Sequence, residues 1–145
     1  MRAPTLIPAS YLILTRENEI LLSQRRNTGH QDGNYSLPAG HVEKGETFTQ
    51  CIIREAQEEI NISLKEEDLK VVHVLSRKSF DTDDRIEIFF QSSKWESEVK
   101  NMEPEKCGDL AWFPLDQLPK NMTPWVRTAI QHFQKRVVFS EFDWK

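Results

Sequence analysis

Residues 40–62, GHVEKGETFTQCIIREAQEEINI, join a glycine-containing loop to a segment with helical periodicity. From Thr47 to about Ile60, apolar residues recur at every third or fourth position, which is typical of an amphipathic helix. Thr47 is a candidate N-cap, because Gln50 follows three residues later as in a capping box. We therefore expect a helix that begins where the loop ends and buries one side.

Three glutamates of this helix, Glu55, Glu58 and Glu59, are spaced three and four residues apart, so their carboxylates lie on the same side. Like charges at this spacing destabilise a helix by roughly 0.2–0.5 kcal/mol per pair. A sequence that needed only a stable helix would avoid them, whereas hard cations such as Mg²⁺ require oxygen ligands. The spacing alone leaves two interpretations open, a solvated acidic face and a divalent metal site.

The loop before the helix holds four of the five glycines of the protein: Gly29, Gly33, Gly40 and Gly45. Glycine permits positive φ angles and close backbone approach, so this pattern predicts a loop with a defined structure. Tyr35 and Leu37 argue against a floppy surface loop because they supply apolar anchors. A structured loop facing the glutamates favours the metal interpretation.

The segments on either side have strand or helix periodicity. We expect strands at 9–16, 19–26, 69–79, 85–91 and 110–113, and a second amphipathic helix at 123–138. Turns should join the paired strands at Glu17-Asn18 and at Asp81–Asp84. This order of elements predicts an α/β fold with a mixed sheet covered by helices on both faces.

The charge of the protein is unevenly distributed along its 145 residues, a length suited to one domain. Residues 46–68 carry a net charge of −5, while the rest of the chain carries +1. A protein that binds a nucleic acid polymer would instead present a basic face to the phosphates. We therefore expect no nucleic acid polymer as a partner.

The cysteine pattern and the hydropathy indicate in which cellular compartment the protein is expected. Cys51 and Cys107 form no CxxC pair and have no His–Cys spacing for zinc, so we expect packed thiols in a reducing cytoplasm. No stretch approaches the ~20 apolar residues that a membrane span needs, so no membrane partner is expected. Monomer and homodimer remain equally open.

The stretch 40–62 resembles the signature of the Nudix family, in which glycine, glutamate, an Arg-Glu pair, a Glu-Glu pair and a closing glycine follow at fixed spacings. Eight of its nine fixed positions match: Gly40, Glu46, Arg54, Glu55, Ala56, Glu58, Glu59 and Ile62. Only Asn61 departs, standing where the pattern has glycine. Asparagine tolerates the left-handed conformation needed after a helix, so the expected metal site is little affected.

This resemblance implies a single Nudix hydrolase domain over residues 1–145, with an α/β/α sandwich fold and a mixed central sheet. It also implies Mg²⁺, or Mn²⁺ as a substitute, as the cofactor. The implied metal ligands are Glu55, Glu58, Glu59 and the carbonyl of Gly40. The implied catalytic residues are Glu58, Glu55, Arg54 and Glu46. In this scheme Arg54 orients the carboxylates by pairing with Glu46, and Glu58 or Glu55 is the general base.

Other residues resemble the branch of the family that hydrolyses nucleoside triphosphates. The residues with an implied substrate contact are Arg25, Arg26, His41, Glu105, Trp125 and Arg127. Structural alternatives exist: Arg25 and Arg26 as strand-end charges, Trp125 as part of the apolar side of the last helix. Glu103 and Glu105 lie in a loop that often supplies a further metal ligand or base in this family. His30 and His41 could contact phosphate or be solvated loop residues.

The expected function is Mg²⁺-dependent hydrolysis of a (deoxy)nucleoside triphosphate, a small-molecule substrate, to the monophosphate and pyrophosphate. One alternative is a hydrolase of another organic pyrophosphate, such as a nucleoside diphosphate sugar or a dinucleoside polyphosphate. A non-catalytic nucleotide sensor is the alternative of another class, although sensors on this fold usually lose the signature carboxylates. NADH-cleaving relatives often carry a four-cysteine zinc module, which two cysteines cannot supply.

The aromatic C-terminal tail, with Phe139, Phe142 and Trp144, is compatible with three roles. It could cover the core, line the substrate pocket or contact a second subunit.

Overall fold

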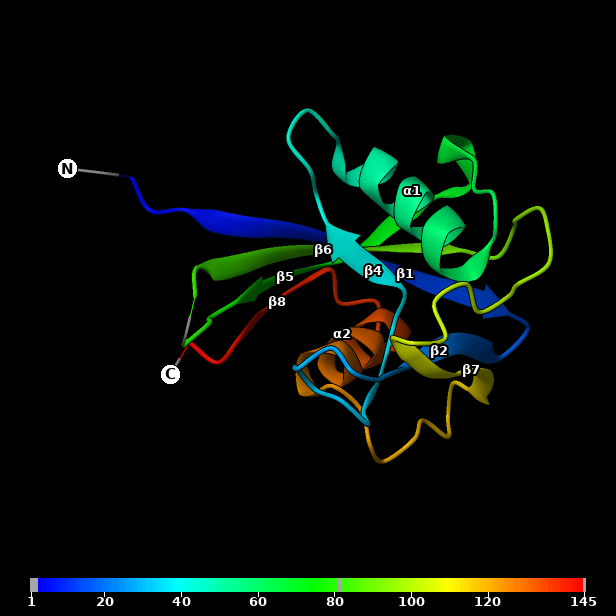
Figure 1. The fold of residues 1–145 in the computed structure, drawn as a ribbon. Helices are drawn as coiled ribbons and strands as arrows, with labels where there is room; N and C mark the ends of the chain where they lie inside the picture. The colour runs from blue at the N-terminus through cyan, green and yellow to red at the C-terminus, as the bar shows by residue number, and fades with distance from the viewer. Residues whose placement is uncertain (1–2, 81, 145) are drawn as a thin grey trace.

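The structure is a computed structural model that describes residues 3–80 and 82–144. Its elements in chain order are β1 (Leu6–Arg16), β2 (Glu19–Arg25), β3 (Tyr35–Ser36), β4 (Ala39–His41), α1 (Phe48–Ile60), a 3₁₀ turn (Glu66–Asp68), β5 (Lys70–Arg77), β6 (Asp84–Ser92), β7 (Cys107–Pro114), α2 (Pro124–Gln134) and β8 (Phe139–Phe142) (Figure 1). Asp81, in the turn predicted before β6, lies outside the described residues. Neither α1 nor α2 is long and apolar enough to cross a membrane.

A mixed sheet occupies the centre of the described residues. Its strands follow the order β3–β2–β1–β6–β5–β8, with β4 paired to β1 and β7 paired to β2. β1 runs parallel to β6 and β5 runs parallel to β8, whereas the other pairs are antiparallel. The predicted α/β fold with a mixed central sheet is therefore confirmed.

The side chains of β1 alternate between two hydrophobic cores, because successive residues of a strand point to opposite faces of the sheet. Ala9, Tyr11 and Ile13 pack in the core that contains α2, whereas Leu12 and Leu14 pack in the core that contains α1. Figure 1 shows the two helices on opposite sides of the sheet. This alternation places the glutamate-bearing helix on one face and leaves the other face to α2.

Both ends of α1 are fixed by local hydrogen bonds. The amide of Gln50 donates to Thr47 Oγ1 at 3.0 Å, and the amide of Thr47 donates to Gln50 Oε1 at 2.9 Å, so the predicted capping box is present. At the other end Asn61 has φ 68°, the left-handed conformation expected where the signature has glycine. The helix therefore begins and ends where the sequence predicts.

The C-terminal part of the sequence prediction is partly wrong. The second helix was expected to extend to residue 138, but α2 ends at Gln134, and Arg136 has a φ of 60°. The chain then reverses and pairs Phe139–Phe142 in parallel with β5, which satisfies backbone groups that a longer helix would have used. Phe142 packs against the core beside α2, so at least this part of the tail covers the core.

The capping box gives a direct test of how firmly α1 is held. Replacing Thr47 with alanine removes the side-chain acceptor, and we expect the free energy of unfolding to fall by about 1 kcal/mol. Urea denaturation followed by circular dichroism measures the change. Thr49→Ala is the matched control because it removes the same atoms two residues further along, inside α1, without removing the cap. An equal loss in both variants would contradict the capping role of Thr47.

Candidate active site

Arg54 of α1 is the centre of a network of acidic side chains. Its Nε and one terminal nitrogen donate to the two carboxylate oxygens of Glu46 at 2.7 and 3.0 Å. Its other terminal nitrogen donates to Glu55 at 2.6 Å and to Glu58 at 3.0 Å. A planar guanidinium can satisfy several carboxylates in this way, which a lysine cannot. The structure thus contains the expected pairing of Arg54 with Glu46.

One guanidinium charge does not balance the carboxylates that surround it. The hydrogen bond from Arg54, followed by one from the amide of Glu43, lowers the pKa of Glu46 to about 2. Burial raises the pKa of Glu59 well above its ordinary value, and the adjacent Glu55 and then Glu103 raise it further. The acidic cluster around Arg54 therefore combines one strongly stabilised carboxylate, Glu46, with others whose negative charge is only partly compensated.

Gly40 of β4 lies directly beneath the helix. A Cβ atom at this position would lie 2.2 Å from Cδ of Glu55, so the carboxylate occupies space that a side chain would fill. The neighbouring amide of Ala39 donates to Glu59 Oε1 at 3.4 Å, a long hydrogen bond. The carbonyl of Gly40 accepts a contact from the Cys51 thiol at 3.4 Å. β4 therefore sets how closely the glutamates approach the sheet.

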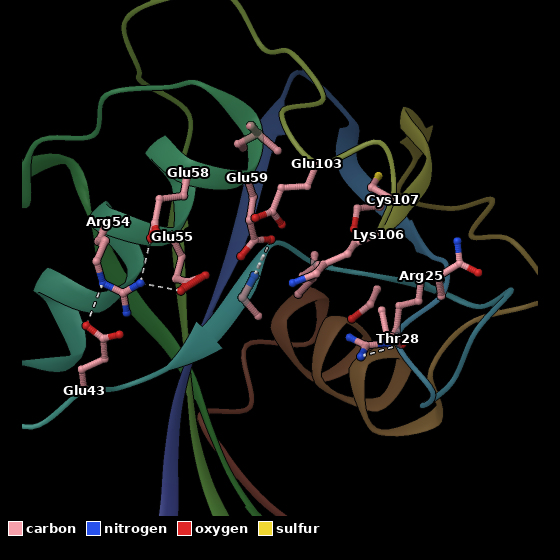
Figure 2. A pocket seen from close by; sticks show the side chains of 16 residues that line it. Arg25, Thr28, Glu43, Arg54, Glu55, Glu58, Glu59, Glu103, Lys106 and Cys107 are labelled. Carbon is pink, nitrogen blue, oxygen red and sulfur yellow. Dashed lines mark hydrogen bonds and ion pairs between the residues drawn. The ribbon is translucent and has the colours of Figure 1, made fainter.

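One wall of a cavity of about 560 Å³, which we call the carboxylate cavity, is formed by Arg54, Glu55, Glu58 and Glu59 of α1; we call this side the carboxylate wall. Its charged lining residues are Arg25, Glu43, Arg54, Glu55, Glu58, Glu59, Glu103 and Lys106. Figure 2 shows the glutamates of α1 on one side and Lys106 and Arg25 on the other. The volume lies within the usual range of small-molecule sites, about 300–1,000 Å³. Acidic and basic groups thus face the same space.

The donor set fits a hard divalent cation in its chemistry. Glu55 and Glu103 are near enough to Glu59 to raise its pKa, and such a cluster of oxygen donors is what Mg²⁺ binds. As drawn, however, residues 3–80 and 82–144 contain no group of three or more His, Cys, Asp or Glu side chains arranged to hold a metal ion. Arg54 holds Glu55 and Glu58 toward itself, so cation binding would require these side chains to turn.

Three of the residues predicted to contact substrate line cavities. Arg25 lines the carboxylate cavity and also a second cavity of about 720 Å³ across β4. His41 and Trp125 line this second cavity, which we call the tryptophan cavity. His41 Nε2 lies 3.4 Å from a terminal nitrogen of Arg85. Residues from β2, β4 and α2 therefore meet around the tryptophan cavity.

The other three predicted substrate residues line neither of these two cavities. Arg26 lies beside Gly108. A Cβ atom placed on Gly108 would be 3.4 Å from Cδ of Arg26. Glu105 is exposed, and its carbonyl accepts a hydrogen bond from Asn27 at 3.2 Å. Arg127 donates to the carbonyls of Pro119 and Lys120 and so braces the turn before α2.

The loop before β7 contributes residues that were not among the catalytic, metal-binding and substrate-binding residues expected from the sequence. Glu103 and Lys106 line the carboxylate cavity, and partial burial raises the pKa of Glu103 although the charge of Lys106 opposes the shift. The sequence signal for Glu103 was its place in an acidic loop, which pointed equally to Glu105. Lys106 had no signal, because only the fold brings residue 106 opposite α1.

Comparison with known proteins identifies relatives by sequence. The family model of the NUDIX domain matches residues 5–133. The chain is 30% identical over 121 residues to the NAD-capped RNA hydrolase NudC of Pectobacterium carotovorum, covering 83% of this chain and 44% of that protein. It is 30% identical over 129 residues to the protein of the same name from Pseudomonas aeruginosa, covering 89% and 43%. The chain thus spans less than half the length of these curated relatives.

Solved structures show the same fold. The MutT NUDIX hydrolase from Burkholderia pseudomallei superposes with a TM-score of 0.81 at 24% identity, covering 88% of this chain and 97% of that one. The MutT protein from Methanosarcina mazei Go1 superposes with a TM-score of 0.78 at 20% identity, covering 93% and 97%. At these identities the likeness establishes the architecture.

The lowered pKa of Glu46 makes its contribution to stability depend on pH. A carboxylate with a depressed pKa stabilises the folded state above its unfolded pKa, about 4.3, and loses that contribution as the pH falls toward the folded value. We expect wild type to melt at a higher temperature than Glu46→Gln at pH 7. The difference should shrink between about pH 4.3 and pH 2. A difference that is constant over this range would contradict the pairing.

Proposed function

The chain belongs to the NUDIX family, and on that premise we propose that it hydrolyses a (deoxy)nucleoside triphosphate to the monophosphate and pyrophosphate. The observation that carries the proposal is the carboxylate cavity, where the glutamates of α1 face Lys106 and Arg25. A metal-binding acidic wall opposite cationic side chains suits a phosphate chain, because each phosphate oxygen can be neutralised from one side or the other.

The proposed cofactor is Mg²⁺, with Mn²⁺ as a substitute. Glu55, Glu58, Glu59 and the carbonyl of Gly40 would hold it, with Glu103 as a further carboxylate facing the cavity. When bound, the ion neutralises charge on the pyrophosphate and lowers the pKa of a coordinated water. The close approach of Gly40 to Glu55 and the raised pKa of Glu59 support this assignment, since both describe carboxylates crowded without enough positive charge.

The side chains of the protein have separate roles in the proposed reaction. Arg54 orients Glu55 and Glu58 through the hydrogen bonds of its terminal nitrogen, while Glu46 fixes the guanidinium from the other side. Glu58 or Glu55 accepts the proton of the attacking water, because both carboxylates face the cavity. Lys106, opposite them, binds the phosphate oxygens.

A dinucleotide pyrophosphate is the second candidate substrate class. It is favoured by the similarity to two proteins named NAD-capped RNA hydrolase, each 30% identical to this chain. The net charge of −4 and the excess of acidic residues in 46–68 argue against a long contact with an RNA chain. The small nucleotide therefore remains the preferred substrate, and the dinucleotide is tested beside it.

The proposal also includes a single domain over residues 1–145, active in the cytoplasm. The thiols support a reducing compartment: both cysteines are free, and burial raises the pKa of Cys51 to about 11. A thiol with a raised pKa is a poor nucleophile, so Cys51 acts in packing beneath β4 rather than in chemistry.

A substrate panel tests the function. The purified protein is incubated with nucleoside triphosphates, nucleoside diphosphate sugars, dinucleoside polyphosphates, NAD, NADH and NAD-capped RNA, each with Mg²⁺ and with a chelator. We expect Mg²⁺-dependent release of monophosphate and pyrophosphate, fastest from a triphosphate. Faster cleavage of a dinucleotide would shift the assignment to the second candidate. No cleavage of any member would contradict the proposal.

Two glycine variants tie the activity to the carboxylate wall. Gly40→Ala places a Cβ against the flexible end of Glu55, so we expect a folded protein whose activity falls on the order of 100-fold. Gly108→Ala is the matched control, because its nearest neighbour lies at an ordinary 3.4 Å. Full activity in Gly40→Ala would contradict the assigned wall.

The Glu58→Gln variant tests the general base separately. Its hydrolytic activity should fall about 10²-fold or more if Glu58 is the base.

A further inference from the structure

The tryptophan cavity contains an aromatic contact that the proposed reaction leaves unused. The ring of His30 stacks on the indole of Trp125, with 5.7 Å between ring centroids and 26° between planes. The cavity shares Arg25 and Ala39 with the carboxylate cavity. A ligand with its phosphates at the carboxylates can therefore place another part of itself beside Trp125.

Arg77 lies over the ring of Trp125 and is itself held in place. The guanidinium carbon of Arg77 lies 3.8 Å from the centroid of the indole, and Arg77 is held by two hydrogen bonds to Glu87 at 2.9 and 3.2 Å. Glu87 is only 1% exposed, so moving Arg77 would leave a buried charge unpaired. The edge of the ring is fixed as well, because Trp125 Nε1 donates to Tyr11 at 3.3 Å.

The second contact on the Trp125 ring is made by His30, a side chain that can move. The backbone around His30 is held, since Arg25 Nε donates to the His30 carbonyl at 2.7 Å and the Gly29 amide donates to Asp32 at 2.9 Å. His30 is exposed, and within the described part of the chain its ring nitrogens make no hydrogen bond. The ring can therefore rotate away while the loop stays in place.

The space between the two rings is too narrow for a third. Stacked carbon atoms need about 3.5–4.0 Å, so a ring inserted between His30 and Trp125 would require about 7–8 Å between them. The observed separation is 5.7 Å. A planar ligand on this face must therefore replace the imidazole rather than slide beneath it.

We propose that His30 is a specificity-determining residue, which occupies part of the Trp125 ring surface and yields it only to a planar ring that stacks better than imidazole. A purine, with two fused rings, covers the indole more fully than imidazole does, whereas a sugar or an alkyl group has no flat aromatic surface to stack on it. The inference rests on the proposed function for the phosphate end of the ligand. It names the substrate class as a purine nucleotide.

Equilibrium binding tests the proposal without requiring turnover. Dissociation constants are measured by calorimetry for AMP, GMP, CMP, UMP and ribose 5-phosphate, with wild type, His30→Ala and His30→Phe. His30→Ala should bind the purine monophosphates about two- to tenfold more tightly, because the competing ring contact is gone. His30→Phe should bind them more weakly than wild type. Ribose 5-phosphate should bind all three proteins equally.

A Trp125→Leu variant should remove the preference for purines over ribose 5-phosphate, and Trp144→Leu, which changes an exposed tail residue, is its control. Weaker purine binding by His30→Ala would indicate a clamp and overturn the proposal, as would identical binding by the three His30 proteins. Absence of a purine preference in wild type would overturn it too. If the protein hydrolyses triphosphates but the three His30 proteins bind purine monophosphates equally, this inference alone is wrong. If binding follows the expected order but no substrate is hydrolysed, the proposed function alone is wrong.

Discussion

The guanidinium of Arg54 holds together a helix face that would otherwise repel itself. It reaches Glu46 with two nitrogens and Glu55 and Glu58 with the third, all within 3.0 Å. One positive charge cannot balance three carboxylates, and Glu59 beside them is partly buried and has a raised pKa. The repulsion between these carboxylates lowers the stability of the folded protein, and a cation that enters the cavity would relieve it. The site is therefore built around a deficit of positive charge, and the rest of the structure keeps that deficit in place.

The short strand β4 separates the two halves of the site. On one side Gly40 lets the Glu55 carboxylate approach the backbone, and on the other side His41 faces the tryptophan cavity. Arg25 reaches both cavities from the end of β2. Under the proposed function, a ligand with a phosphate chain and a flat ring would be bound at both ends, with the phosphates at the glutamates of α1 and the ring at Trp125.

Local patterns predicted the parts of the fold that local forces decide. The capping box at Thr47 and the left-handed Asn61 both depend on neighbouring residues, and both are visible in the sequence. The end of α2 was misjudged, because the apolar period continues past Gln134 while the chain is diverted into β8 by pairing with β5. The carboxylate wall was predicted from one helix, whereas Lys106 and the stack of His30 on Trp125 depend on contacts between distant segments.

The central claim, that the glutamates of α1 are an incomplete cation site, is tested most directly by thermal unfolding with and without Mg²⁺. The melting temperatures of wild type and Glu59→Gln are measured in a chelator and in millimolar Mg²⁺. Wild type should be stabilised by Mg²⁺, by about 2.7 kcal/mol when the ion is at 100 times its dissociation constant. Glu59→Gln should be at least as stable as wild type in the chelator and should gain less from Mg²⁺. A wild-type melting temperature that does not respond to Mg²⁺, with or without nucleotide, would contradict the account.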